Sequence, residues 1–244
     1  MSLNKKLTFL SFFVMALGAN VEAAPDIFLS SVYDFLPSDQ ASYNKSISNN
    51  GDTTAFVKIA VKEVKFDKNG KVIEGELLSG DGMDDRLVVS PNRLIIPAKG
   101  SRSSRVMFTG SRDVERYFRV SFVPVLPTQE NGFGTQAEIE SQRTLSAGFN
   151  VLIGYGALVY IAPKNATYDT KFNNLSDRFE IVNNGTASVK FTFFVMCSTD
   201  KKCTDPSTAI LRPGKAISYD KKSTSSVRFI LVEGRKEKEH AFKF

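Results

Sequence analysis

Residues 116–125, RYFRVSFVPV, decide the fold class of this chain. In an extended strand successive side chains point to opposite faces, so residues at every second position share a face. One face of this stretch is apolar, and it consists of Phe118, Val120 and Phe122. The other face is polar or amphipathic, and it consists of Tyr117, Arg119 and Ser121. Such alternation predicts a β-strand with one side against a core.

The same two-residue period recurs along most of the chain, notably in 55–64 (AFVKIAVKEV) and 187–195 (ASVKFTFFV). Clusters of asparagine, glycine and proline separate the alternating runs, for example at 68–70 and 212–214. No long segment repeats its apolar residues with the period of a helix. Many short strands between turn signals predict an all-β protein, built as sandwiches or barrels.

The first 23 residues resemble a secretory signal peptide rather than a part of the fold. Lys5 and Lys6 precede an apolar segment, and Val21 and Ala23 occupy the small-residue positions of a cleavage site. We therefore expect export of the chain and cleavage after Ala23.

A domain boundary is expected near Pro163. The residues after it have their own alternating runs and both cysteines of the chain, and their number suits a small sandwich. The sequence thus predicts a first domain over 24–163 and a second over 164–244.

Charge and cysteine content narrow the class of protein further. The formal net charge is +6, and the basic residues are scattered among acidic ones instead of forming a stripe, which argues against a nucleic-acid partner. In an exported chain the two cysteines, Cys197 and Cys203, are expected to form a disulfide. With His240 as the single histidine, a metal site lacks the ligands it would need.

Catalytic signatures are missing from the sequence. A serine triad would have to use His240 near the C-terminus, and no serine has the glycine pattern of a nucleophile elbow. Residues 67–76, DKNGKVIEGE, superficially resemble a calcium loop, but Lys71 and Val72 stand where a ligand and a glycine belong. That segment is better interpreted as a hairpin turn. We expect neither an enzyme nor a cofactor.

The stretch 144–163, TLSAGFNVLIGYGALVYIAP, is uncharged before Lys164 and is interrupted by three glycines. Asn150 and the glycines argue against a membrane span, and the flanking charges carry no topology signal. Two interpretations remain: an ordinary core strand, or an edge strand whose apolar face is offered to another protein. Edges are normally protected by charge or proline, and this one has neither. Its apolar positions are Leu145, Ala147, Phe149, Val151 and Ile153.

Several segments together resemble the periplasmic chaperones of the chaperone–usher pathway, in particular the branch that serves common-pilus and colonisation-factor fimbriae. They are LVVSPNRLIIPAKGSRSSRVMF (87–108), ERYFRVSFVPV (115–125), the loop 127–143, the stretch 144–163, NNGTASVKF (183–191), CSTDKKC (197–203) and LRPGK (211–215).

This resemblance implies two immunoglobulin-like sandwiches at an angle with a cleft between them. It also implies a non-enzymatic periplasmic protein that binds pilin subunits and delivers them to an outer-membrane usher. The stretch 144–163 would contain the strand donated to the subunit, and the free protein could hide that strand by self-association. A pilin or adhesin subunit is the rival class, but its donor strand would lie at the mature N-terminus and not in mid-chain.

The family also holds the subunit's C-terminal carboxylate with basic residues in the cleft. The classical branch of these chaperones uses an arginine near the mature N-terminus and a lysine on the donor strand. Here the segment APDIFLSSVYDFLP has no basic residue, and Leu158 falls near the lysine position. Arg119, Lys164 and Arg116 are the candidates for this role.

Overall fold

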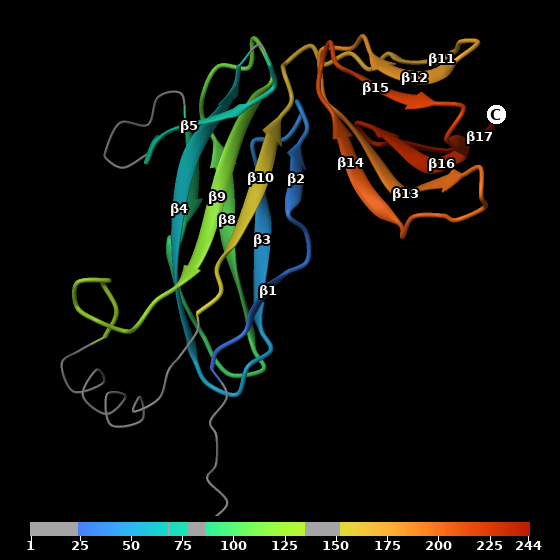
Figure 1. The fold of residues 1–244 in the computed structure, drawn as a ribbon. Coiled ribbons are helices and arrows are strands. Elements are labelled where there is room, and N and C mark those ends of the chain that lie inside the picture. The colour runs from blue at the N-terminus through green and yellow to red at the C-terminus, as the bar shows by residue number, and fades with distance from the viewer. Residues whose placement is uncertain (1–23, 68, 78–85, 135–151) are drawn as a thin grey trace, which may run out of the picture.

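The computed structural model describes residues 24–67, 69–77, 86–134 and 152–244. These residues form two β-sandwiches set at an angle and joined at one end (Figure 1). The predicted all-β class is confirmed. In the described ranges no helix is long and apolar enough to cross a membrane.

The first sandwich consists of two sheets. One has the strand order β1-β3-β8-β6, and the other has the order β2-β10-β9-β4-β5, with β7 also paired to β4. The strands are β1 (Ile27–Leu29), β2 (Tyr33–Leu36), β3 (Ser42–Asn49), β4 (Ala55–Phe66), β5 (Val72–Leu77), β6 (Leu87–Ser90), β7 (Arg93–Ile96), β8 (Ser101–Phe108), β9 (Arg116–Pro124) and β10 (Tyr155–Ile161).

The second sandwich packs the sheet β11-β12-β15 on the sheet β14-β13-β16-β17. Its strands are β11 (Thr170–Asn174), β12 (Arg178–Asn183), β13 (Val189–Ser198), β14 (Ser207–Leu211), β15 (Ala216–Asp220), β16 (Thr224–Glu233) and β17 (Lys236–Lys243).

Each sandwich has its own apolar core. In the first, the alternation that predicted β9 is confirmed, because Phe118, Val120 and Phe122 are all buried. The core of the second sandwich is rich in phenylalanine, and its largest fully buried side chains are Phe179, Phe191 and Phe229.

The N-terminal segment crosses from one sheet of the first sandwich to the other. β1 pairs antiparallel with β3, whereas β2 pairs in parallel with β10. Lys45 of β3 holds the crossing, since its buried ammonium donates to Ser31 O at 2.5 Å and to Asp34 Oδ1 at 2.9 Å. Tyr43 adds a hydrogen bond from its hydroxyl to Asp34 Oδ2 at 3.0 Å. A buried lysine is tolerated here because the carboxylate and the carbonyl compensate its charge.

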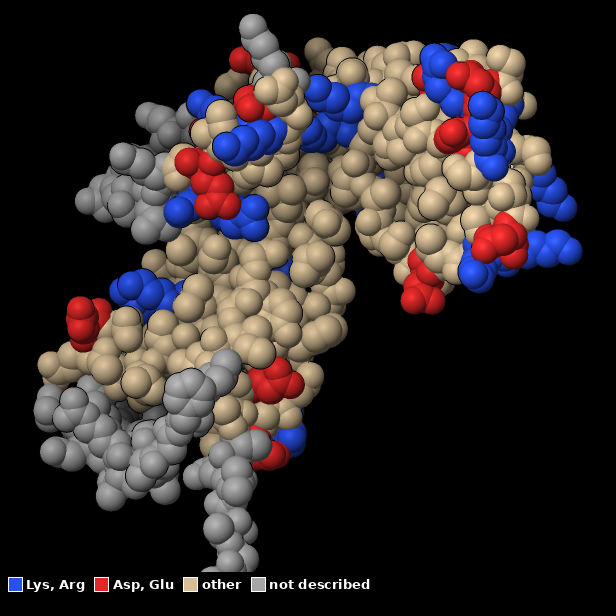
Figure 2. All heavy atoms as spheres, in the orientation of Figure 1, with Lys and Arg blue, Asp and Glu red and all other residues tan. Residues whose placement is uncertain are grey.

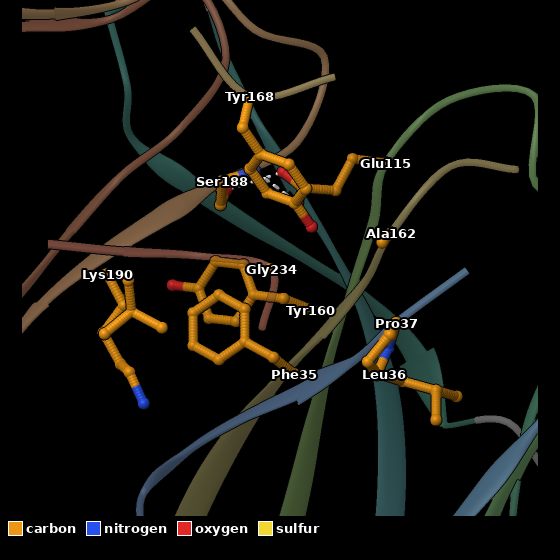
Figure 3. A pocket seen from close by; sticks show the side chains of 11 residues that line it. Phe35, Leu36, Pro37, Glu115, Tyr160, Ala162, Tyr168, Ser188, Lys190 and Gly234 are labelled. Atoms are coloured by element: carbon orange, nitrogen blue, oxygen red, sulfur yellow. Dashed lines mark hydrogen bonds between the residues drawn. The ribbon is translucent and has the colours of Figure 1, made fainter. Parts of the chain in front are cut away.

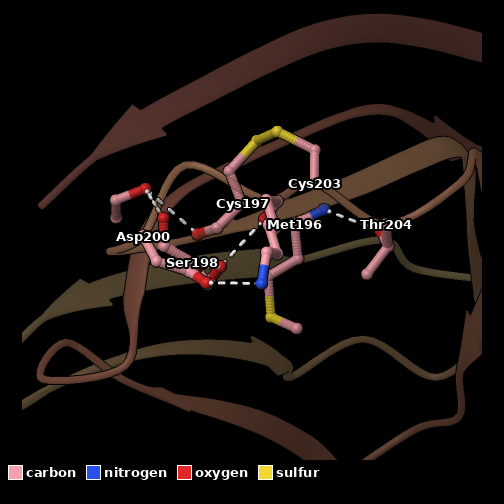
Figure 4. Close-up of a disulfide and its surroundings, with 8 residues drawn as sticks. Met196, Cys197, Ser198, Asp200, Cys203 and Thr204 are labelled. Atoms are coloured by element: carbon pink, nitrogen blue, oxygen red, sulfur yellow. Dashed lines mark hydrogen bonds and ion pairs between the residues drawn. A yellow bond between two sulfur atoms is a disulfide. The ribbon is translucent and has the colours of Figure 1, made fainter.

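Two predictions about turns and bridges are also confirmed. β4 and β5 pair as an antiparallel hairpin, and at its turn Lys71 N donates to Asp67 Oδ1 at 2.7 Å and Gly70 takes φ of 81°. Cys197 and Cys203 form a disulfide that joins the end of β13 to the following loop (Figure 4). Met196 N donates to Thr204 Oγ1 beside it at 3.1 Å.

Candidate functional site

The apolar face of β10 runs from the core of the first sandwich toward its open end. Ala157, Val159 and Ile161 are buried, and Ile153, which has the same parity, is 62% exposed just before the strand begins. The remaining predicted donor residues, Leu145, Ala147, Phe149 and Val151, lie outside the described residues.

Among the described strands, one edge of β10 has no partner over its first residues. β9 pairs with the strand from Tyr155 onward, but β2 joins the other edge only from Leu158. The N-terminal end of β10 therefore has no β2 partner, which is the arrangement expected of a strand that another protein could extend.

Strand pairing places four residues in one row on the outer face of this sheet. Lys62 of β4 is opposite Arg119 of β9, Arg119 is opposite Leu158 of β10, and Leu158 is opposite Tyr33 of β2. Side chains directly opposite each other in a sheet share a face. Leu158, near which the resemblance would place a lysine, and its neighbour Tyr33 are thus neutral, whereas β9 and β4 carry two cations in the same row.

This outer face looks toward the second sandwich. Two residues further along β2 and β10, on the same face, Phe35 and Tyr160 stack with ring centroids 4.7 Å apart. Together with Lys190 and Val232 of the second sandwich they line a pocket of about 60 Å³ at the junction (Figure 3). Beyond the junction the two lobes diverge and leave a hollow between them (Figure 2).

The two cations of the row share one carboxylate. Arg119 Nε lies 2.5 Å from Glu74 Oε1, and Lys62 Nζ lies 3.6 Å from Glu74 Oε2. All three side chains are 33 to 39% exposed. Figure 2 shows side chains of both signs gathered on the part of the first sandwich nearest the second, above a mostly uncharged surface.

The side chain of Arg119 lies against Gly156 of β10. A Cβ placed on Gly156 would be 3.8 Å from both Cγ and Cδ of Arg119 and 3.4 Å from its Nη1. The arginine stem therefore lies against β10 at a residue that β2 does not pair. At Gly154 the backbone of β9 leaves little room for a side chain, since a Cβ there would lie 3.0 Å from Phe122 O.

The other two anchor candidates lie elsewhere. Arg116 has the parity of the core residue Phe118, and its guanidinium binds Glu63 Oε1 through Nε at 3.0 Å and Nη2 at 2.7 Å. It also lies over the rings of Phe108 and Phe118. Lys164 is exposed, and its backbone N–H donates to Arg112 O at 2.8 Å. Neither residue belongs to the row that contains Arg119.

The alternation of 55–64 predicts a water-facing Lys62 but gives no reason to assign it to a site. Glu74 was part of a segment interpreted only as a hairpin. The two-residue period indicated on which face Lys62 lies. Its contact with Glu74 could not be predicted, because it depends on a register shift between β4 and β5 at 62–64 that no local sequence pattern indicates.

A polar contact fastens the two sandwiches together. Glu115 accepts from Ser188 N at 2.7 Å, from Ser188 Oγ at 2.6 Å and from the Tyr117 hydroxyl at 2.7 Å. Burial raises the pKa of Glu115, and these hydrogen bonds oppose the rise because they favour the ionised form. The contact fixes the junction at the pocket that Phe35 and Tyr160 line.

Comparisons with known proteins agree on the class. No protein-family model matches the chain. A protein of Escherichia coli K12 with the name probable fimbrial chaperone EcpB is 24% identical over 214 residues, which is 85% of this chain and 86% of the relative. A Shigella boydii protein of the same name has the same identity and coverage.

Two solved structures are similar in fold. The class 5 fimbriae chaperone CfaA has a TM-score of 0.53 at 20% identity, over 89% of this chain and 97% of its own. The CupB2 chaperone of Pseudomonas aeruginosa has a TM-score of 0.52 at 12% identity, over 89% and 100%. The two-sandwich fold is thus that of the fimbrial chaperones. The resemblance to the chaperones of the chaperone–usher pathway is confirmed.

Proposed function

We propose that this chain is a periplasmic chaperone that binds pilin subunits by lending them a strand and delivers them to an outer-membrane usher. The carrying observation is the continuity of β10: its buried stripe leads to an exposed Ile153, beside an edge that β2 does not cover. A subunit with an incomplete sandwich gains both a strand and apolar side chains from such a segment.

The donor residues remain those of the sequence prediction, with Phe149, Val151 and Ile153 as the main side chains inserted. Full burial of each contributes about 1.5–3 kcal/mol, so three together can hold a subunit before backbone hydrogen bonds are added.

A solved structure supports the choice of partner. A chaperone of Acinetobacter baumannii, CsuC, which is 11% identical with a TM-score of 0.51, is described in a pre-assembly complex with the tip adhesion subunit CsuE. By analogy, the partner of this chain is a subunit of the pilus that it serves.

Arg119, assisted by Lys62, is the proposed anchor for the C-terminal carboxylate of the subunit. Charge-assisted hydrogen bonds from a guanidinium to a carboxylate are short and directional, so they fix register as well as affinity. The position of Arg119 supports this role, because its stem lies against Gly156 where the donor strand leaves the sheet.

Export and domain limits complete the proposal. The signal peptide is cleaved between Ala23 and Ala24, and the first domain ends at Pro163. In support of this limit, β10 ends at Ile161, β11 begins at Thr170, and no core cluster of the described residues contains members from both sides.

The test is a pair of substitutions of opposite parity. Val151→Asp puts a charge on the proposed inserted face, and Asn150→Asp puts the same charge on the other face. With co-expressed secreted proteins from the same source, we expect Val151→Asp to abolish co-purification of a subunit and Asn150→Asp to retain it. Equal capture by both variants would contradict strand donation.

A further inference from the structure

The proposed anchor is already bound by a carboxylate of the chain itself. Glu74 bridges Arg119 and Lys62 at 2.5 and 3.6 Å, on the face that looks into the cleft. The contact with Arg119 is an ion pair, since Arg119 Nε has no hydrogen-bond partner among the described residues. A bound C-terminus would likewise place a carboxylate between the two cations.

We infer that Glu74 is an internal competitor for this site, and that subunit capture exchanges its carboxylate for the C-terminal carboxylate of the subunit. This inference rests on the proposed function and concerns the regulation of the same site. A second carboxylate beside the first meets like-charge repulsion, and departure of Glu74 relieves this repulsion and frees both cations for the incoming group.

The surroundings of Glu74 allow it to leave. Its side chain is one-third exposed, and β5 pairs with β4 alone among the described strands. Val72 and Ile73 beside it are exposed, so movement of this part of β5 disturbs little buried surface. The Glu63–Arg116 pair in the same sandwich differs, because it is more buried and its guanidinium lies over two phenylalanine rings.

Exchange would serve both capture and release. Before capture, Glu74 compensates the two cations and weakens the attraction of unrelated acidic peptides. During release, the Glu74 carboxylate can return as the subunit's terminus departs. Arg119 and Lys62 then have a carboxylate partner throughout. The affinity for a C-terminus is then lower than the bare cations would give, and removal of Glu74 should raise it.

Two synthetic octapeptides of alternating valine and threonine test this, one with a free C-terminal carboxylate and one with a C-terminal amide. Their dissociation constants are measured by NMR titration of the full mature chain, with the Nε–H signal of Arg119 as a local reporter. The variants are Glu74→Gln, Arg119→Ala and, as a charge-matched control, Asp52→Asn, which removes the partner of Lys99 in an exposed pair.

We expect the preference for the acid over the amide to rise several-fold in Glu74→Gln, to stay at the wild-type value in Asp52→Asn and to vanish in Arg119→Ala. An unchanged preference in Glu74→Gln, with loss in Arg119→Ala, would overturn the exchange and leave the anchor intact. A wild-type chain that does not prefer the acid, or that binds neither peptide, would overturn both. Strand donation would still be judged separately by Val151→Asp.

Discussion

For Arg119 the sequence predicts the face of the strand on which the side chain lies but not the groups that it contacts. Parity placed it on the outer side of its strand, and the structure adds what it contacts: Glu74 on one side and Gly156 on the other. A glycine that interrupts an apolar run in the sequence therefore lies against an arginine stem.

Arg119→Ala should weaken subunit capture strongly and leave the fold intact. The ion pair that it loses is more than one-third exposed, and such pairs contribute about 0–1 kcal/mol to stability. Co-purification of the subunit and the thermal melting of the free chain measure the two effects. Lys99→Ala, which removes a cation from a more exposed pair, is the control and should change neither. Normal capture by Arg119→Ala would remove this residue from the anchor.

His240 makes the stability of the second sandwich depend on pH. Its ring lies against Phe172, with centroids 4.7 Å apart, and burial lowers its pKa, with a smaller lowering from Lys238 and an opposing effect from Glu233. Because the folded pKa is below the unfolded value of about 6.5, protonation favours the unfolded chain. Stability should thus be fully present above pH of about 6.5 and decline as the pH falls toward the folded pKa.

Thermal unfolding between pH 7.5 and 5 measures this decline. His240→Phe keeps an aromatic ring and removes the titration, so the difference in melting temperature between wild type and variant should grow as the pH falls. Glu115 acts in the opposite direction, since a raised pKa stabilises the fold at low pH, and it is common to both proteins. A pH-independent difference would show that the ring does not titrate in this range.

At the scale of elements, the strands were predictable where alternation and burial are local. β9 follows its pattern at each position, and the hairpin between β4 and β5 follows from its turn residues. The stretch 144–163 was harder, because its apolar positions were predicted in the first half, whereas the strand that the structure describes, β10, is in the second half. An apolar run does not indicate which of its residues pair with another strand. Here β9 pairs from Tyr155, and β2 pairs in parallel only from Leu158. β2 is distant in the sequence, so local patterns do not predict this pairing.

The disulfide is an element-scale feature with a limited effect. Cys197 and Cys203 are six residues apart, and closing so short a loop restricts the unfolded chain by about 2 kcal/mol. The double variant Cys197→Ser with Cys203→Ser should therefore lower the melting temperature of the second sandwich only. Subunit capture should persist, because the bridge is seven residues further along β13 than Lys190, which lines the junction. Loss of capture without destabilisation would indicate a direct role in binding.

At the scale of the whole molecule, the proposed function needs the two sandwiches at a fixed angle. The row that contains Arg119 then stays at a constant distance from the second sandwich. Glu115 supplies three accepted hydrogen bonds across or beside the junction. A second contact, Arg235 Nη2 to Asp39 Oδ2 at 2.6 Å, also crosses it, but both of its side chains are more than half exposed. Buried polar groups lose more than exposed ones when a partner is removed.

Glu115→Ala should loosen the angle between the sandwiches, whereas Asp39→Ala should change it little. The first variant leaves the Ser188 N–H and the Tyr117 hydroxyl without their acceptor, while each sandwich keeps its own apolar core and its strands. Small-angle X-ray scattering should show a broader distribution of dimensions for Glu115→Ala, with unchanged circular dichroism and weaker subunit capture. If its scattering matched that of the wild type, other contacts, such as that of Lys190 with Phe35, would have to set the angle. If instead Asp39→Ala loosened the molecule equally, burial would not be what gives the Glu115 contact its strength.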